Sequence, residues 1–176
     1  LDGTDNLETR FLLNDVAVKN ATPWIYGACV GAEGRVLSIL PGETPCLRCL
    51  WDEPPPPGSL PTCETAGVIG PIVHIVAGFQ GAEALKVLAG KRAEVSRKML
   101  VIEAWTGRVH STSISGARDA ECPCCGRRDF EFLRGGRTAS TTALCGRNAV
   151  QVLPPHAGQI DLEVLARRLP AKLQPQ

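Results

Sequence analysis

The stretch CLRC at residues 46–49 has the same cysteine spacing as CPCC at residues 122–125, and these two pairs decide the interpretation of the chain. A C-x-x-C segment presents two sulfurs to one side of a metal ion, and zinc favours four ligands in a tetrahedron at about 2.3 Å for thiolate sulfur. We therefore expect a closed, structural zinc site that joins two distant segments through Cys46, Cys49, Cys122 and Cys125. The alternative is a pair of redox-active dithiols or disulfides.

The composition limits the classes of protein to which the chain can belong. It has 176 residues, of which 44% are hydrophobic and 21% charged, and its formal net charge is +1. These values are typical of a folded domain, with or without an appendage, and argue against disorder. The small charge disfavours binding to nucleic acid or to an anionic membrane, and 5% aromatic residues weaken the case for a nucleic-acid-binding zinc ribbon. No leader-like segment is visible, and we expect a cytoplasmic location.

Alternating and helical patterns predict a mixed α/β chain. Asp5 and Glu8 have the spacing of a capping box, and a helix is expected over residues 6–19. Apolar, β-branched segments predict two antiparallel strand pairs, at 23–40 and at 97–114, the second turning at Thr106 and Gly107. Near the end of the chain a strand is expected within 141–154 and a short helix within 161–171.

The longest apolar stretch, residues 65–90, predicts a buried helix. A membrane span needs about 20 consecutive apolar residues, and His74, Gln80 and Glu83 interrupt this one. Its glycines lower helix stability by roughly 1 kcal/mol each relative to alanine, so we expect close packing against a sheet or a second subunit to offset this loss.

Two further cysteines need separate interpretation. Cys63 follows the proline-rich stretch DEPPPPGSLPT and precedes the predicted apolar helix, where free backbone amides and the helix dipole favour a thiolate. A nucleophilic thiol and an incidental exposed cysteine are equally consistent with that position. Cys124 lies between two predicted ligands, and it is either a competing ligand or an idle thiol.

Four of these segments together resemble the second half of the ThiF/MoeB/HesA family, the bacterial relatives of ubiquitin-activating enzymes. They are LDGTDNLETRFLLND, CLRCLW, CETAGVIGPIVHIVAGFQGAEALKVLAG and CPCCG, in that order along residues 1–126. The resemblance implies part of a Rossmann-like α/β sheet with a four-cysteine zinc site, and a homodimer. Residues 127–176 resemble a small α+β extension found in some members, and the resemblance gives that extension no role.

The resemblance also implies an activity. The C-terminal carboxylate of a ubiquitin-like sulfur-carrier protein attacks the α-phosphate of ATP, and an aspartate that maps onto Asp5 holds magnesium in a loop at the carboxyl edge of a parallel sheet. From the residues alone Asp5 is a plain helix cap; Asp2 has weaker support as a neighbour of the same site.

Cys63 matches a cysteine that takes part in sulfur transfer in some relatives. This match adds a sulfur-donor protein as an expected partner. Arg10 and Asn14 also match family positions, but helical spacing fits a solvated face equally well and we leave them out of the site.

The parts of the family that bind ATP are missing from these residues. No G-x-G-x-x-G turn follows a predicted strand, and the glycines near residue 70 come after the first cysteine pair. We expect a truncated record of a longer adenylyltransferase that does not bind ATP by itself. The alternative is a non-catalytic, zinc-stapled docking subunit of a heteromeric activating enzyme.

Overall fold

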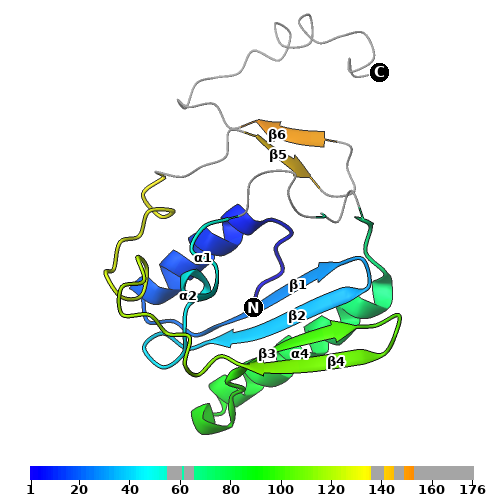
Figure 1. Ribbon diagram of the computed structural model, residues 1–176, viewed down its shortest axis with the longest axis horizontal. Helices are drawn as coiled ribbons and strands as arrows, with labels where there is room; N and C mark the ends of the chain where they lie inside the picture. Colours follow the sequence, from blue (N-terminus) through cyan, green and yellow to red (C-terminus); the bar gives the residue numbers. More distant parts are fainter. Residues whose placement is uncertain (55–60, 62–65, 136–140, 145–148, 153–176) are drawn as a thin grey trace, which may run out of the picture.

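The computed structural model describes residues 1–54, 61, 66–135, 141–144 and 149–152. Its main element is a four-stranded antiparallel sheet in the order β1-β2-β3-β4, formed by Trp24–Val30, Glu33–Ile39, Lys98–Glu103 and Arg108–Ser113. Helix α1 (Leu7–Lys19) lies over one face of this sheet and helix α4 (Gly70–Leu88) over the other (Figure 1). The predicted α/β class is confirmed.

The sheet differs from the expected Rossmann-like arrangement. All strand pairs among the described residues are antiparallel, and the parallel contact is an isolated bridge between Gly31 and Val68. The loop that carries Asp5 therefore does not leave a parallel strand within the described part of the chain. Instead the first residues run beside β1, where the Asp2 N–H donates to the Ile25 carbonyl at 2.9 Å.

Alternation along β1 and β2 divides the core into two clusters. Side chains of a strand point alternately to its two faces, so Trp24 and Tyr26 face α1 whereas Ile25 faces α4. The first cluster adds Phe11 from α1, and the second is completed by residues of α4 and the sheet, namely Val36, Ile72, Val76 and Ile102.

Helix α1 begins with a different cap from the one expected. Asn6, not Asp5, is the N-cap residue, and its Oδ1 accepts the N–H of Thr9 at 2.8 Å. The predicted helix over 6–19 is otherwise confirmed. Because Asn6 performs the capping, the Asp5 carboxylate is not needed to satisfy the first turn of the helix.

Helix α4 packs closely on β1 and β2 because the strands, not the helix, supply the small residues. A Cβ atom on Gly34 would overlap Val76 and Ile72, and one on Gly27 would overlap the side chain of Gln80. A Cβ on the helix glycines 70, 78 or 81 would meet nothing within 4 Å. The predicted helix is confirmed over Gly70–Leu88, with a later start than residue 65, and so is its close packing against a sheet. It is not buried all round, because its outer face exposes apolar side chains.

Both predicted strand pairs are present, and the later segment differs. The turn between β3 and β4 contains Gly107 at φ 71°, in the left-handed region that favours glycine. Within 141–154 the structure contains two strands, β5 (Thr141–Leu144) and β6 (Ala149–Val152), which pair antiparallel, where we expected one. The predicted helix over 161–171 lies outside the described residues, as does Cys63.

The boundary after residue 126 stays a prediction. Phe132 packs against Phe11 of α1 with ring centroids 5.0 Å apart, so the core of the first segment extends at least that far along the chain. Among the described residues, no helix combines the length and the apolar character needed to cross a membrane.

Candidate functional site

Four cysteine side chains from two distant segments meet in one place. The Sγ atoms of Cys46 and Cys122 lie 3.6 Å apart, and those of Cys49 and Cys125 lie 3.3 Å apart. The Sγ atoms of Cys46 and Cys49 are 3.9 Å apart, and all four Sγ atoms lie within 4.8 Å of one another. The structure thus brings together the four residues that the cysteine spacing singles out.

Local backbone structure shapes each pair. Cys46 caps the one-turn helix α2 (Leu47–Leu50), and the Cys49 N–H donates to the Cys46 carbonyl at 3.1 Å. In the second pair the N–H groups of Gly126 and Arg127 both donate to the Cys122 carbonyl, at 3.0 and 2.9 Å. A Cβ atom on Gly126 would overlap the Ala120 carbonyl, so glycine is required after the second pair.

The geometry fits a tetrahedral thiolate-bound ion. Ligand sulfurs about 2.3 Å from a central zinc are about 3.8 Å from one another, close to the sulfur–sulfur distances of this cluster. None of Cys46, Cys49, Cys122 and Cys125 is part of a disulfide. With four sulfurs on the ion, no position is left for water, so the donor set suits a structural site.

The thiols cannot all ionise without a cation, because they crowd one another. A hydrogen bond from the Cys125 thiol lowers the pKa of Cys49 to about 2. The pKa of Cys46 is raised, chiefly by its contact with the Cys124 thiol, and that of Cys125 is raised chiefly by its contact with Cys46. A bound divalent cation would stabilise each thiolate and so lower the raised pKa values of Cys46 and Cys125.

Two buried side chains of α1 support the cluster. Asn14 Oδ1 accepts the Leu47 N–H at 2.8 Å, and Asn14 Nδ2 donates to Cys124 Sγ at 3.2 Å. The next residue, Asp15, accepts the N–H groups of Phe132 and Leu133 through Oδ2, at 3.0 and 3.2 Å. Both side chains are fully buried.

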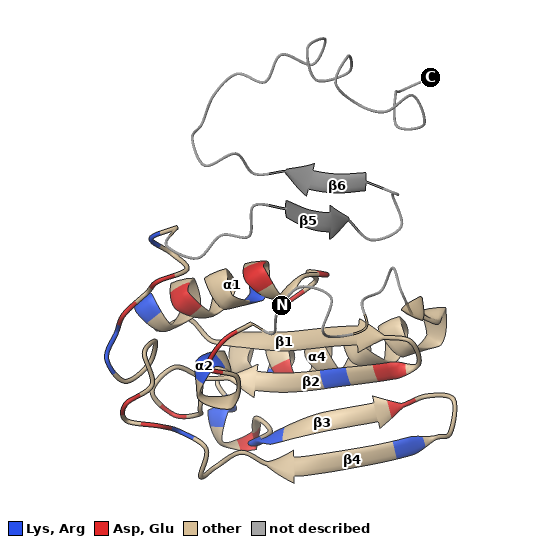
Figure 2. Cartoon of the chain, turned by 45° about the horizontal axis from the view of Figure 1, so that its top comes forward, with Lys and Arg blue, Asp and Glu red and all other residues tan. Residues whose placement is uncertain are grey.

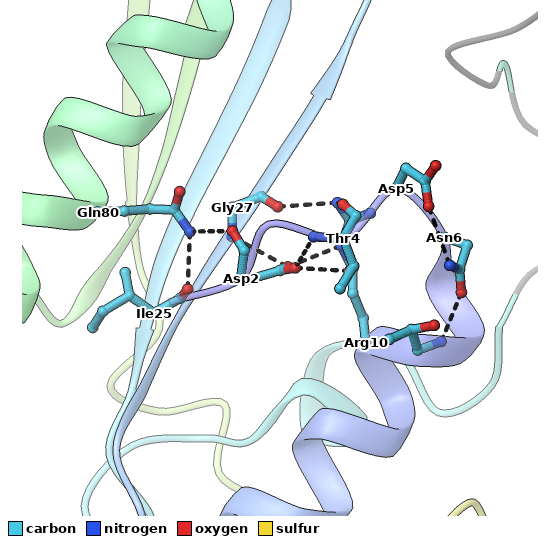
Figure 3. Close-up of polar contacts among 9 residues, drawn as sticks. Asp2, Thr4, Asp5, Asn6, Arg10, Ile25, Gly27 and Gln80 are labelled. Atoms are coloured by element: carbon cyan, nitrogen blue, oxygen red, sulfur yellow. Dashed lines mark hydrogen bonds and ion pairs between the residues drawn. The ribbon is translucent and has the colours of Figure 1, made fainter. Parts of the chain in front are cut away.

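The second feature is the turn at residues 2–5, which we call the acidic turn (Figure 3). The side chain of Asp2 is fully buried and its Oδ2 forms an ion pair with Arg10 Nε at 2.9 Å. Its Oδ1 accepts the N–H and the hydroxyl of Thr4, at 2.8 and 2.7 Å. Both oxygens of the Asp2 carboxylate therefore have partners inside the protein, and the group is not available to a ligand.

Helices α1 and α4 hold the acidic turn in place beside β1. From α1, Arg10 Nη2 donates to the Thr4 carbonyl at 2.6 Å and to the Gly27 carbonyl of β1 at 3.0 Å. From α4, Gln80 Nε2 donates to the carbonyls of Asp2 and Ile25, at 2.8 and 3.0 Å (Figure 3). The turn is thus fixed by hydrogen bonds from both faces of the sheet.

Asp5 stands apart from this buried network. Its side chain is exposed, and its Oδ1 accepts a hydrogen bond from Asn6 Nδ2 at 3.2 Å. It immediately precedes the cap of α1, where the free N–H groups of the helix leave a partial positive charge. Of the two acidic residues in the turn, Asp5 is the one that can reach a ligand from solvent.

The interpretation of Arg10 and Asn14 as members of a solvated helix face was wrong. Arg10 is 8% exposed and Asn14 is 0% exposed. Neither position has a distinguishing local pattern, because their partners, Asp2 and Cys124, become neighbours only in the folded chain. Cys63 lies outside the described residues, so its role stays a prediction.

Comparisons with known proteins identify the family of the chain. Residues 1–124 match the model of the ThiF family. The chain is 41% identical over 169 residues to the "Sulfur carrier protein ThiS adenylyltransferase" of Bacillus subtilis (strain 168), covering 96% of this chain and 49% of that protein. It is 38% identical over 131 residues to the "Sulfur carrier protein adenylyltransferase" of Thermus thermophilus, covering 72% of this chain and 48% of that protein.

A solved structure shows the same fold at low sequence identity. The crystal structure of Escherichia coli MccB with ATP aligns with a TM-score of 0.53 and 18% identity, over 72% of this chain and 38% of that one. The chain spans about half the length of the two curated relatives above.

Proposed function

The chain belongs to the ThiF family, and we propose that it forms part of an adenylyltransferase that activates a ubiquitin-like sulfur-carrier protein with ATP. The names of its relatives support this choice, since two of them are adenylyltransferases of sulfur-carrier proteins. The observation that carries the proposal is the exposed Asp5 carboxylate on a turn that the buried Asp2 and Arg10 pair holds in place.

The proposed reaction joins a carboxylate to a nucleotide. The C-terminal carboxylate of the carrier attacks the α-phosphate of ATP, the bond to the β-phosphate breaks, and pyrophosphate leaves with the electron pair. Such reactions are promoted mainly by positioning and by neutralising phosphate charge, and magnesium would supply that neutralisation. In this proposal Asp5 holds the ion, because its carboxylate is exposed and anchored by its backbone.

Arg10 has a different role in this proposal from that of a phosphate-binding arginine. Its guanidinium is already paired with Asp2 and with the carbonyls of Thr4 and Gly27. We assign it to holding the turn. The groups that bind the base, ribose and phosphates of ATP would then belong to parts of the longer protein outside these residues, which agrees with the missing G-x-G-x-x-G pattern.

The four-cysteine cluster is proposed to hold structural zinc. Cys46, Cys49, Cys122 and Cys125 offer the number, type and spacing of ligands that zinc takes in closed sites. The site would fasten the segment after β2 to the segment after β4. Because such thiols must remain reduced to bind the ion, we place the protein in the cytoplasm.

Cys63 is proposed to act after adenylation, in transfer of sulfur from a donor protein to the activated carrier. The support for this role is the match of Cys63 to the family's sulfur-transfer cysteine; helix α4 begins at Gly70, so its N-terminus does not adjoin Cys63 in the sequence. In the full-length protein, Cys63→Ser should leave ATP–pyrophosphate exchange unchanged and reduce formation of the carrier thiocarboxylate. Thiocarboxylate formation at the wild-type rate would remove Cys63 from the mechanism.

The outer face of α4 supports the further proposal of a homodimer. It exposes large apolar side chains along the whole helix: Val73 is 46% exposed, Phe79 44%, Leu85 68% and Leu88 82%. Figure 2 shows that α4 carries few charged residues, and none falls between Gly70 and Ala82. We propose that a second copy covers this face. In sedimentation of the full-length protein, Phe79→Asp should give monomers; an unchanged dimer would exclude this face.

The central test measures ATP–pyrophosphate exchange by the full-length protein with its carrier. Asp5→Asn should lower the exchange rate by about 100- to 1,000-fold, the usual cost of removing one group that stabilises transition-state charge. The control is Glu94→Gln, which also neutralises an exposed carboxylate, one paired with Lys91 at the surface. Wild-type exchange by Asp5→Asn would refute the role of Asp5. No exchange by the wild-type protein would favour the docking subunit.

A further inference from the structure

One amide side chain touches both cysteine pairs. Asn14 Oδ1 accepts the N–H of Leu47, which lies between Cys46 and Cys49. Asn14 Nδ2 donates to the sulfur of Cys124, which lies directly before Cys125. The two segments that Asn14 connects are 76 residues apart in the sequence.

The contacts of Asn14 also explain the extra cysteine. Cys124 is fully buried and receives the Asn14 N–H at 3.2 Å. Its thiol therefore lies on the α1 side of the cluster and serves as a hydrogen-bond acceptor there. Through Cys124, α1 is hydrogen-bonded to the segment that carries the second pair. The two interpretations from the sequence, a competing ligand and an idle thiol, did not include this role.

Asp15 strengthens the attachment of α1 on the same side. It is fully buried, and its Oδ2 accepts two backbone N–H groups just beyond the second pair, from Phe132 and Leu133. Two consecutive residues of α1 thus hold the segment that carries Cys122 and Cys125.

The other end of the same helix holds the acidic turn. Asn6 caps α1, and Arg10 binds Asp2 and the Thr4 carbonyl. Asn6 and Asn14 are eight residues apart, which corresponds to about 12 Å along an α-helix. A helix transmits a displacement of one end to the other because its hydrogen-bonded turns move together.

We infer that Asn14 is a positioning residue that couples the four-cysteine centre to the acidic turn through α1. The inference rests on the metal proposed for that centre and is independent of the adenylation reaction. Coupling between two sites is reciprocal, so an ion that orders the cysteine segments also orders the turn. Residues that orient ligands without binding the metal typically change metal affinity about 10- to 100-fold when they are replaced.

The first test measures release of zinc from the full-length protein to a chromogenic chelator. Asn14→Ala loses both contacts and should release zinc about 10- to 100-fold faster. Asn14→Asp keeps the acceptor for the Leu47 N–H and should give an intermediate rate. The matched control is Asn20→Ala, which removes an exposed asparagine of the same helix whose Nδ2 donates to the Val16 carbonyl; its release should match wild type.

The second test measures the coupling by hydrogen exchange of the backbone amides in residues 1–10. With zinc bound, Asn14→Asp should exchange faster in this segment than wild type, and removing zinc should speed exchange in wild type much more than in the variant. Wild-type release by Asn14→Ala, or equal effects of zinc removal on wild type and Asn14→Asp, would overturn the inference. Failure of the proposed function gives different results. Absence of stoichiometric zinc in the wild-type protein would refute the proposed metal centre. Absence of ATP–pyrophosphate exchange would refute the proposed reaction alone.

Discussion

Replacing Arg10 by methionine isolates the buried ion pair that holds the acidic turn. The Asp2 side chain is 0% exposed and that of Arg10 is 9% exposed, with Nε and Oδ2 2.9 Å apart. In Arg10→Met the carboxylate keeps its burial and loses its cation, and the carbonyls of Thr4 and Gly27 lose a donor. Removal of one partner from a buried pair costs about 3–5 kcal/mol. We expect a loss of that size in the free energy of unfolding.

A surface pair on β2 provides the matched control. Arg35 Nη2 lies 2.7 Å from Glu33 Oε1, but these side chains are 43% and 41% exposed. Water screens such a pair, so Arg35→Met should cost no more than about 1 kcal/mol. The two arginine replacements thus differ in burial and not in the distance to the carboxylate.

The assay is urea unfolding of the full-length protein, followed by tryptophan fluorescence, to which the buried Trp24 contributes. Asp2→Asn and the double variant complete a thermodynamic cycle. Asp2→Asn in the Arg10→Met background removes the unpaired charge and should recover a large part of the loss. The coupling energy between the two positions should then exceed about 1 kcal/mol, as expected for groups in direct contact. A loss for Arg10→Met as small as that of Arg35→Met would refute the anchoring of the turn by this pair.

Three smaller predictions concern the surroundings of the turn and the cluster. Asn6→Ala removes the cap that accepts the Thr9 N–H and should lower the free energy of unfolding by about 1 kcal/mol, measured by circular dichroism. Gly27→Ala should destabilise the protein because its Cβ overlaps the Gln80 side chain, and Gln80→Ala in the same chain should relieve part of this loss in thermal unfolding. Burial raises the pKa of Asp15, so its stabilising contribution is complete below its ordinary pKa of 3.8 and is lost as pH rises through the folded-state value; the stability of Asp15→Asn relative to wild type should therefore increase with pH between 3.8 and the folded-state pKa, and stay constant above it.

The sequence predicts best where the signal is local. Alternation in residues 23–40 predicts β1 and β2, because each strand buries one set of side chains under α1 and the other under α4. Cysteine spacing predicts the cluster, because four ligands must come from two C-x-x-C segments whatever the fold between them. In both cases the residues that matter are separated by a fixed, short interval.

Other features depend on partners that are distant in the sequence. The close contact of α4 with the sheet is made possible by Gly27 and Gly34 of the strands, which no helical pattern reveals. The pattern of residues 141–154 predicts one strand because it does not separate the two runs that form β5 and β6. The pairing of β2 with β3, which joins the two predicted strand pairs into one sheet, is likewise a contact between segments distant in the sequence.

The two aspartates of the acidic turn differ in burial, which the spacing of residues in the sequence does not predict. A buried carboxylate requires a partner and so becomes structural, whereas an exposed one next to a helix N-terminus retains capacity for a ligand. Asp2 is 4% exposed and paired with Arg10, while Asp5 is exposed because Asn6 has taken over the cap. The same arginine that makes Asp2 unavailable also fixes the backbone that presents Asp5. An aspartate at residue 5 therefore has a defined position only if residues 2 and 10 keep their charges, and this requirement links the function proposed for Asp5 to the stability measured for Arg10.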